Sequence, residues 1–263
     1  DLFREVFRVE RSESVWLWKF FRNPAGSFSY LCEADGRVIA HCGGTPVRFR
    51  AYAKPVVALQ SVDFMSSASY AGGVGGGGVF VRMVRAFFED FCGPTKIPVV
   101  YGFPGERHRL LGERLLGYRP VERVVEFEIE PAGSPLAADP LRKSDCSLFD
   151  QTIAVGAVRD APYLRWRYLD HPLYRYHVVR VKSRWSLRAS AAAIVRETEE
   201  RTYVMELFAR DTAAMRELVA RLARIGKPAI IWMGPESPQG RALRDSGVRC
   251  ADRDHYVEVR FFM

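Results

Sequence analysis

The chain has 263 residues, of which 48% are hydrophobic and 27% charged, so it has the composition of a globular protein with one large or two modest cores. No run approaches the roughly 18 consecutive apolar residues of a membrane span, and residues 1–5 carry no signal-peptide pattern, so we expect no membrane association. The net charge of +8 comes mainly from arginines scattered along the chain, which argues against a nucleic-acid surface.

The five cysteines, Cys32, Cys42, Cys92, Cys146 and Cys250, form no CxxC pair. This spacing suits neither a zinc site nor a disulfide framework. We therefore expect no metal, and a reducing, cytoplasmic setting.

The first half opens with apolar residues at helical spacing over 5–22, which end at Asn23-Pro24. Asp35-Gly36 supplies the turn chemistry of a β-hairpin. Strands are expected at 28–33, 37–41, 45–52 and 56–65. After a glycine run, the apolar positions of Val79–Phe91 predict a strongly amphipathic helix. A strand at 97–103, a helix at 107–116, a strand at 121–130 and a Pro/Gly/Ala-rich linker from 131 complete this half.

One segment of the first half recurs in the second. Trp18-Lys19-Phe20-Phe21-Arg22-Asn23-Pro24 matches Trp166-Arg167-Tyr168-Leu169-Asp170-His171-Pro172, 148 residues later. Beyond it we expect strands at 176–181, 189–197, 202–209, 229–233 and 255–262 and helices at 211–226 and 241–246. This order predicts a duplicated module; the alternative is two unrelated amphipathic segments that each end at a proline.

The fold class expected from this order is α+β, with two tandem modules that each hold a mixed, mainly antiparallel sheet flanked by helices. The predicted domains are residues 1–130 and 151–263, joined by a linker over 131–150.

The glycine run from Gly72 to Gly78 lies between a predicted strand and the helix that starts at Val79. Glycines let the backbone approach a ligand, and the first turn of a helix offers free N–H groups to an anion. The run is neither a P-loop, since no Lys-Ser/Thr follows it, nor a dinucleotide fingerprint. It predicts a phosphate site, with a flexible low-complexity loop as the alternative.

A strand, a glycine loop and a helix in this order resemble the GNAT superfamily of CoA-dependent N-acyltransferases. Similar segments in that family correspond to Trp18–Pro24, Asp35-Gly36, Gln60-Ser61-Val62-Asp63, Tyr101-Gly102-Phe103-Pro104 and Leu116-Gly117-Tyr118. With the second copy, the chain resembles a tandem-GNAT protein whose C-terminal copy lacks the loop and is degenerate.

The resemblance implies acetyl-CoA, or another acyl-CoA, as cosubstrate. The family binds its pyrophosphate at an Arg/Gln-x-x-Gly-x-Gly/Ala loop, and here Gly73 stands where the family has Arg or Gln. The thioester oxygen would be bound by a backbone N–H at a strand bulge near Phe64–Ser66. The expected cosubstrate-binding residues are Phe64, Met65, Ser66, Gly73, Val74, Gly75, Gly76, Gly77, Gly78 and Val79.

Direct acyl transfer to an amine needs a base, an oxyanion donor and an acid for the thiolate. Asp63 is the nearest carboxylate to the expected bulge and a candidate base, or else a residue that caps the loop. The customary tyrosine acid is absent, because its position falls at Glu113 or a neighbour. The further catalytic candidates are Tyr70, Tyr101, Glu106 and His108.

The leading hypothesis is an acyl-CoA-dependent N-acyltransferase, most simply an N-acetyltransferase, that acts on a small-molecule amine. A non-catalytic CoA-binding or scaffolding protein is the alternative. A Fem-like aminoacyl transferase is a third possibility, although no long helical hairpin is visible. The sequence defines neither the acceptor, the acyl length nor the oligomeric state.

Overall fold

The computed structural model describes residues 2–52, 54–70, 77–149, 155–182 and 189–262. It forms two compact units, unit 1 (Asp1–Val121, Ile153–Val158 and Tyr256–Met263) and unit 2 (Glu122–Thr152 and Arg159–His255). The fold is mixed α+β with mainly antiparallel strands flanked by helices, which confirms the predicted class. The unit boundaries differ from the expected 1–130 and 151–263, because the last strand continues from unit 2 into unit 1.

The sheet of unit 1 contains strands from both ends of the chain. Its strands are β1 (Phe28–Ala34), β2 (Arg37–Ala51), β3 (Lys54–Ser66), β4 (Val99–Gly102), β7 (Val155–Ala157), the end of β12 (Arg249–Phe261) and the start of β5 (Arg119–Ile129). β1, β2 and β3 are antiparallel neighbours, β3 and β4 are parallel, and β12 lies between β4 and β5. β7 pairs with β2. The final strand is therefore part of the sheet that the first half of the chain begins.

β2 is one strand where the sequence predicts two, over 37–41 and 45–52. The strand continues through Gly43 and Gly44, where the sequence pattern predicts an interruption between two strands. A Cβ on Gly43 would come within 2.8 Å of the Phe20 ring, and one on Gly44 within 2.7 Å of the Leu59 side chain. These glycines are therefore sites of close packing inside a strand.

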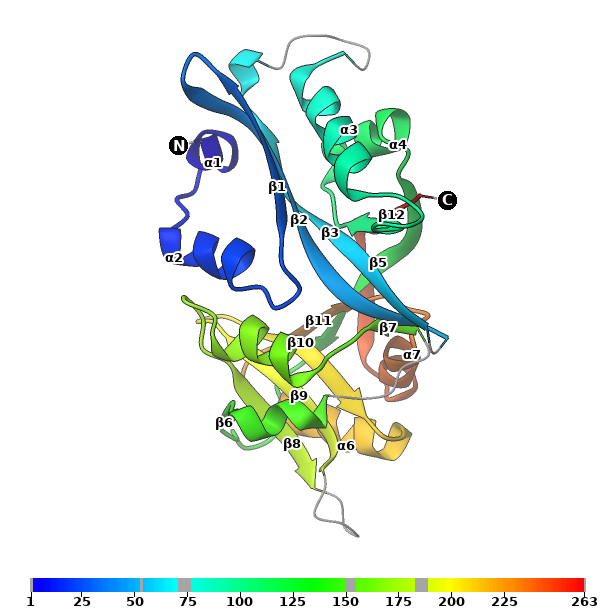
Figure 1. The fold of residues 1–263 in the computed structure, drawn as a ribbon. Helices are drawn as coiled ribbons and strands as arrows, with labels where there is room; N and C mark the ends of the chain where they lie inside the picture. The colour runs from blue at the N-terminus through cyan, green and yellow to red at the C-terminus, as the bar shows by residue number, and fades with distance from the viewer. Residues whose placement is uncertain (1, 53, 71–76, 150–154, 183–188, 263) are drawn as a thin grey trace. The chain divides into compact units, whose positions relative to one another are not determined.

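Helices cover both faces of the unit 1 sheet (Figure 1). On one face lie α1 (Leu2–Phe7), α2 (Glu13–Trp16) and the π-helical turn η1 (Leu17–Phe21); on the other lie α3 (Val79–Phe91) and α4 (Glu106–Leu115), with the 3-10 turn η2 (Ala68–Tyr70) after β3. Trp16 and Phe20 contact the His41 ring, whereas the neighbouring Ala40 and Cys42 belong to the core cluster of α3. In the described parts of the chain, no helix has the length and apolarity needed to cross a membrane.

Unit 2 contains the remaining strands of the strand order and its own helices. Its elements are β6 (Asp139–Pro140), β8 (His177–Lys182), β9 (Ala189–Glu197), β10 (Thr202–Ala209), β11 (Ala229–Met233), α5 (Ala161–Leu164), α6 (Thr212–Ala223), α7 (Pro238–Asp245), the π-helical turn η4 (Arg165–Leu169) and the 3-10 turn η3 (Lys143–Leu148). The strand order is β6-β8-β9-β10-β11-β5, antiparallel except for the β10–β11 pair. β9 and β10 have the predicted bounds.

β9 is buried on both faces. Ala191, Ala193 and Val195 pack in the cluster of α6, while Ala192 and Ile194 pack with η3, α5 and η4. Small alanines let helices approach both sides of the strand, so this nearly continuous apolar run is a central strand.

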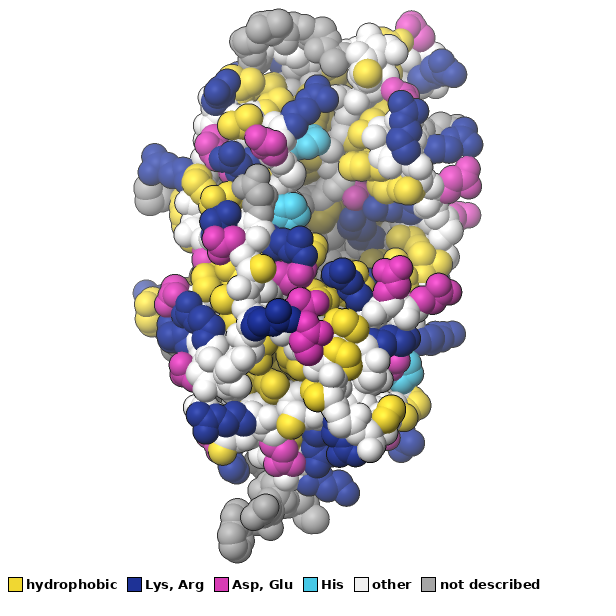
Figure 2. Space-filling view, turned by 180° about the vertical axis from the view of Figure 1, so that it is seen from behind, with side chains coloured by type: hydrophobic (Ala, Val, Ile, Leu, Met, Phe, Trp, Pro, Cys, Tyr) yellow, Lys and Arg dark blue, Asp and Glu magenta, His cyan; other side chains and the backbone are white. Residues whose placement is uncertain are grey.

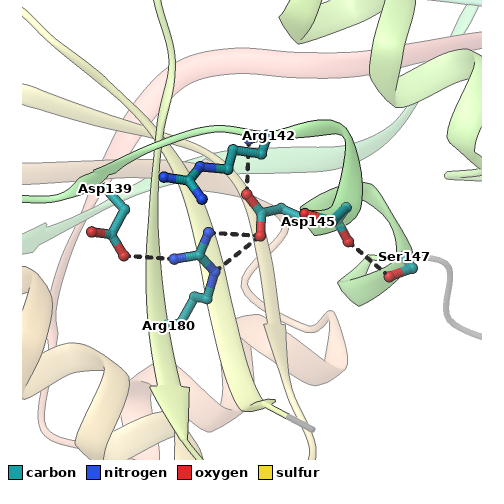
Figure 3. Close-up of polar contacts among 6 residues, drawn as sticks. Asp139, Arg142, Asp145, Ser147 and Arg180 are labelled. Atoms are coloured by element: carbon teal, nitrogen blue, oxygen red, sulfur yellow. Dashed lines mark hydrogen bonds and ion pairs between the residues drawn. The ribbon is translucent and has the colours of Figure 1, made fainter.

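A buried carboxylate ties η3 to β8 in unit 2 (Figure 3). Asp145, 6% exposed, accepts the Arg142 backbone N–H at 2.8 Å and two N–H groups of Arg180 at 3.0 and 2.6 Å. The third Arg180 nitrogen donates to Asp139, whose side chain is 70% exposed.

We expect Asp145→Ala to lower the free energy of unfolding by about 2 kcal/mol, because it removes a hydrogen-bonded charge and leaves Arg180 partly unpaired. Asp139→Ala is the matched control and should cost less than about 1 kcal/mol, since that pair is exposed. Urea denaturation of both variants measures the difference, and equal losses would contradict the expectation.

The two tryptophan segments fold alike. In unit 1, α2 runs directly into the π-helical turn that holds Trp18, and in unit 2, α5 runs directly into the turn that holds Trp166. Corresponding bounds are 148 residues apart throughout, and both tryptophans are buried. The sequence match is thus accompanied by the same uncommon local geometry.

Candidate active site

A cavity of about 230 Å³ opens in unit 1 where β3 and β4 separate. The two strands pair from Ala58 opposite Val99 to Gln60 opposite Tyr101, after which β3 continues to Ser66. Its lining residues are Phe7, Ser61, Val62, Asp63, Phe64, Phe80, Gly102, Phe103, Pro104, Gly105, His108, Leu111, Gly112, Leu116, Tyr118 and Glu258. A mostly apolar cleft with a few polar groups is the usual form of a small-molecule site.

A β-bulge in β3 forms part of the cavity wall. Gly43 pairs with Val62 and His41 with Met65, so β3 has one extra residue in this interval. Asp63 has a φ of 52°, and its carbonyl accepts a hydrogen bond from His41 Nδ1 at 2.8 Å. The bulge therefore lies at Asp63–Phe64, at the start of the expected range.

The Asp63 carboxylate is held by two cations. Lys19 Nζ donates to its oxygens at 2.8 and 2.9 Å, and Arg11 donates to one of them as well. Burial alone would raise the pKa of Asp63, but Lys19 and Arg11 together outweigh it and lower that pKa. A carboxylate stabilised in this way is a weak base, so the structure favours a role in fixing the bulge over proton abstraction.

Unit 2 contains a similar arrangement. β10 has one extra residue between Val204 and Glu206, and the Glu206 carboxylate accepts hydrogen bonds from Arg159 and, at 2.9 Å, from the Tyr168 hydroxyl. Arg159 follows Arg11 by 148 residues, and Arg167, which also interacts with Glu206, follows Lys19 by 148. This pairing of two cations with one carboxylate at a bulge, which we call the bulge clamp, recurs in a unit without a glycine run.

α3 begins next to the cavity without a side-chain cap. Gly78 is its N-cap residue, with extended backbone and no side-chain hydrogen bond to the first turn, and Phe80 lines the cavity. The space where a Cβ on Gly77 would lie is open, with no atom of the described residues within 4 Å. The predicted cosubstrate residues Gly73, Val74, Gly75 and Gly76 lie outside the described residues.

The other predicted cosubstrate residues lie around the bulge and the start of α3. Phe64 lines the cavity, Met65 is buried, Ser66 ends β3 half-buried, and Val79 is the first residue of α3. The end of the bulged strand and the start of the helix thus lie in the same part of unit 1.

His108 of α4 lines the cavity, as Asp63 does, and its burial lowers its pKa, so its imidazole is neutral at pH 7. Three other predicted catalytic residues are not part of the described lining. Tyr70 bonds weakly to Asp35, at 3.4 Å, Tyr101 packs against the Phe49 and Phe103 rings, and Glu106 is exposed in the first turn of α4.

Two residues that the sequence did not indicate join the cavity wall. Glu258 of β12 is 1% exposed, and its Oε1 has no hydrogen-bond partner among the residues that the structure describes. The Tyr118 hydroxyl shares a hydrogen bond of 2.7 Å with Ser61 Oγ. The sequence offered one signal for Glu258. It is the only carboxylate in the predicted strand over 255–262, where it stands between Val257 and Val259.

The charges outside the cavity are mixed. Figure 2 shows Lys and Arg side chains scattered among acidic ones over the face in view, in agreement with the dispersed arginines of the sequence. Among the described residues, no three His, Cys, Asp or Glu side chains are grouped so that they could hold a metal ion.

No protein-family model and no curated protein sequence matches the chain. Solved structures do. A probable N-acyltransferase from Enterococcus faecalis V583 has a TM-score of 0.74 at 14% identity, over 99% of this chain and 68% of its own. A GCN5-related N-acetyltransferase from Anabaena variabilis has a TM-score of 0.69 at 10% identity, and the match covers 99% of this chain and 68% of that protein. Eis1 from Mycobacterium abscessus has a TM-score of 0.65 at 12% identity, and the match covers 99% of this chain and 69% of that protein. The chain therefore has the fold of the GCN5-related N-acetyltransferases.

Proposed function

We propose that the protein is an acyl-CoA-dependent N-acyltransferase that transfers an acyl group, most simply acetyl, to a small-molecule amine. The observation that carries the proposal is the cavity at the β3–β4 fork, with a bulge on one side and an uncapped helix start on the other. Acyl transfer needs groups that bind an oxyanion and an anionic cosubstrate, and both features offer backbone N–H groups.

The residues present fit an acyl-CoA. The phosphates would bind at the start of α3, where Gly77 and Gly78 place no side chain in the way and the helix dipole favours negative charge. The thioester would lie in the cavity near the bulge, whose backbone N–H groups would stabilise the oxygen in the transition state. The bulge clamp keeps those groups in place, which is the pre-organisation that such stabilisation requires.

We propose further that the chain arose by duplication and that unit 2 is a copy without a cosubstrate site. The similar tryptophan segments and the recurring bulge clamp support this. In this proposal the clamp is a structural device inherited by both copies, since unit 2 keeps it without the glycine run.

Gly77→Asp tests the cosubstrate site. A Cβ at this position meets no atom of the part of the chain that the structure describes within 4 Å, and an acidic residue suits a helix start, so thermal stability should be unchanged or slightly raised. The carboxylate would repel phosphate, and we expect the affinity for acetyl-CoA in calorimetric titration to fall at least tenfold, about 1.4 kcal/mol.

Gly77→Ser is the matched control, because it adds a similar side chain without charge and should bind within about threefold of the parent, roughly 0.7 kcal/mol. Unchanged binding in Gly77→Asp would place the phosphates elsewhere. If the parent protein binds neither acetyl-CoA nor CoA, the proposed function fails; binding without turnover of any amine would support a CoA-binding protein instead.

A further inference from the structure

Glu258 occupies the base of the β3–β4 fork. It pairs across the sheet with Gly102, the first residue of β4 beyond its last pairing with β3, and it lines the cavity. Its Oε2 lies against α4, where a Cβ on Gly112 would come within 3.3 Å. Glycine at position 112 therefore permits the close approach of the helix to this carboxyl group.

Glu258 and Glu113 lie within hydrogen-bonding reach of each other. A hydrogen bond between them requires one of the two carboxyl groups to be protonated, because two ionised carboxylates have no hydrogen to place between them. Glu113 is 30% exposed and bonds to Arg109 at 2.7 Å, whereas Glu258 is 1% exposed with one oxygen unpartnered. Glu258 is less exposed to solvent and has no cation bonded to it among the described residues, so it is the carboxyl group that holds the proton more strongly.

We propose that the carboxyl group of Glu258 is the catalytic acid that protonates the leaving thiolate. The inference rests on the proposed function. In the step, the amine nitrogen forms a bond to the acyl carbon, the carbon–sulfur bond breaks, and the sulfur takes the proton of Glu258. The amine loses a proton to solvent, and Glu258 regains one from solvent, so the products are the amide and the free thiol.

An acid role suits Glu258 better than a base role. Burial, the hydrogen bond to Glu113 and the charge of Glu113 raise the pKa of Glu258 to about 7, with Arg109 opposing them. A leaving thiolate whose thiol has a pKa near that of cysteine, about 8.5, takes a proton readily from such a group, whereas an ammonium with a pKa near 10.4 would not give one up to it. The catalytic pKa also lies near neutral pH, where an acid is most effective.

The other polar groups around Glu258 do not replace it as the proton donor. From α4, His108 is neutral at pH 7, and Arg109 and Glu113 form an ion pair. From the loop before β5, burial raises the pKa of Tyr118, whose hydroxyl bonds with Ser61 of β3. Asp63 of β3 is ionised in the bulge clamp and carries no proton.

The first test is a direct titration of the free protein, which is independent of turnover. Infrared difference spectra between pH 5 and pH 9 should show a buried carboxylic acid losing its proton near pH 7. The band should be absent in Glu258→Gln and should titrate at lower pH in Glu113→Gln, because removing the neighbouring negative charge makes ionisation of Glu258 easier. A band that remains in Glu258→Gln would overturn the assignment.

The second test measures thiol release from acetyl-CoA with hydroxylamine, an amine that is uncharged at neutral pH and so needs no base. We expect Glu258→Gln to lower kcat about 100-fold, with the dissociation constant for acetyl-CoA unchanged within about threefold. In the parent, kcat should fall as the pH rises above about 7. Glu113→Gln should shift this fall in kcat to lower pH, and Glu258→Gln should abolish it. Glu89→Gln, on the exposed face of α3, is the control and should match the parent.

The outcomes separate this inference from the proposed function. If the parent binds acetyl-CoA and releases thiol while Glu258→Gln does so equally fast, the acid role is wrong and the function stands. If the parent does not bind acetyl-CoA, the function fails, and with it the role of Glu258. If Glu258→Gln alters the circular dichroism spectrum and abolishes binding of acetyl-CoA, Glu258→Asp takes its place. This variant keeps a carboxylic acid, so it should recover part of the activity and the fall of kcat at alkaline pH.

Discussion

Replacing Asp63 by Asn is expected to lower the free energy of unfolding by about 3 kcal/mol at pH 7, because it leaves the largely buried cations Arg11 and Lys19 without their counter-charge. Asn is chosen because it tolerates the positive φ of this position, so the substitution isolates the charge. Urea denaturation monitored by tryptophan fluorescence measures the loss.

The pH dependence of this effect has a definite sign. The pKa of Asp63 is lowered in the folded protein, so its stabilising contribution is present above the unfolded value, about 3.9, and disappears as the pH falls through the folded value. The difference between parent and variant should therefore shrink in acid. Asp35→Asn is the control, because Asp35 has a similar φ of 53° in an exposed turn and should cost under about 1 kcal/mol.

This experiment also separates the two roles considered for Asp63. A catalytic base could be replaced by Asn with little change in stability and a large loss of turnover. The bulge clamp predicts a large loss of stability, and replacing both cations by Met in the Asp63→Asn background should recover part of it. A fully stable Asp63→Asn protein would contradict the clamp.

Glu258→Gln is expected to raise the stability of the protein above pH 7, whereas Asp63→Asn is expected to lower it. The pKa of Glu258 is raised to about 7, so in the parent its stabilising contribution is complete below the unfolded value of about 4.3 and is lost as the pH rises to about 7. Gln keeps the shape of the neutral carboxyl group and does not ionise. Each pKa unit corresponds to about 1.4 kcal/mol, so the variant should be more stable than the parent by roughly 4 kcal/mol at pH 8.5 and equal to it near pH 4.

Thermal unfolding at the two pH values measures this difference. Glu113→Gln should gain less, since its carboxylate is partly solvated and paired with Arg109. A Glu258→Gln variant that is less stable than the parent at pH 8.5 would mean that the ionised carboxylate has a stabilising partner in the folded protein.

Local pattern was sufficient for much of the fold. The Asp35-Gly36 turn, the bounds of β9 and β10, and α3 from Val79 to Phe91 follow from turn chemistry and periodicity, which act over a few residues. The continuity of β2 did not follow, because what decides it is the fit of Phe20 and Leu59 against Gly43 and Gly44. The destination of β12 depends on pairing across the fold, which no local pattern encodes.

The same distinction applies to the site. The bulge and the helix start are local events; periodicity predicted the helix start, and the resemblance to the GNAT superfamily implied a bulge within a few residues of its position. The partners of Asp63 are 44 and 52 residues away, and Glu258 meets Glu113 only through the fold. The first cation of each clamp could have been found by extending the repeat upstream to Arg11 and Arg159, since the same separation of 148 joins them.

The position of β12 has a consequence for synthesis on the ribosome. Its residues Glu258–Phe261 pair with Val99–Gly102, so this strand of the unit 1 sheet is synthesised after all of unit 2. At roughly 5–20 residues per second, the strands on either side wait several seconds with unpaired edges, a state prone to misfolding. Premature termination before β12 would therefore yield a chain that lacks Glu258 and leaves the β4 edge of the unit 1 sheet unpaired.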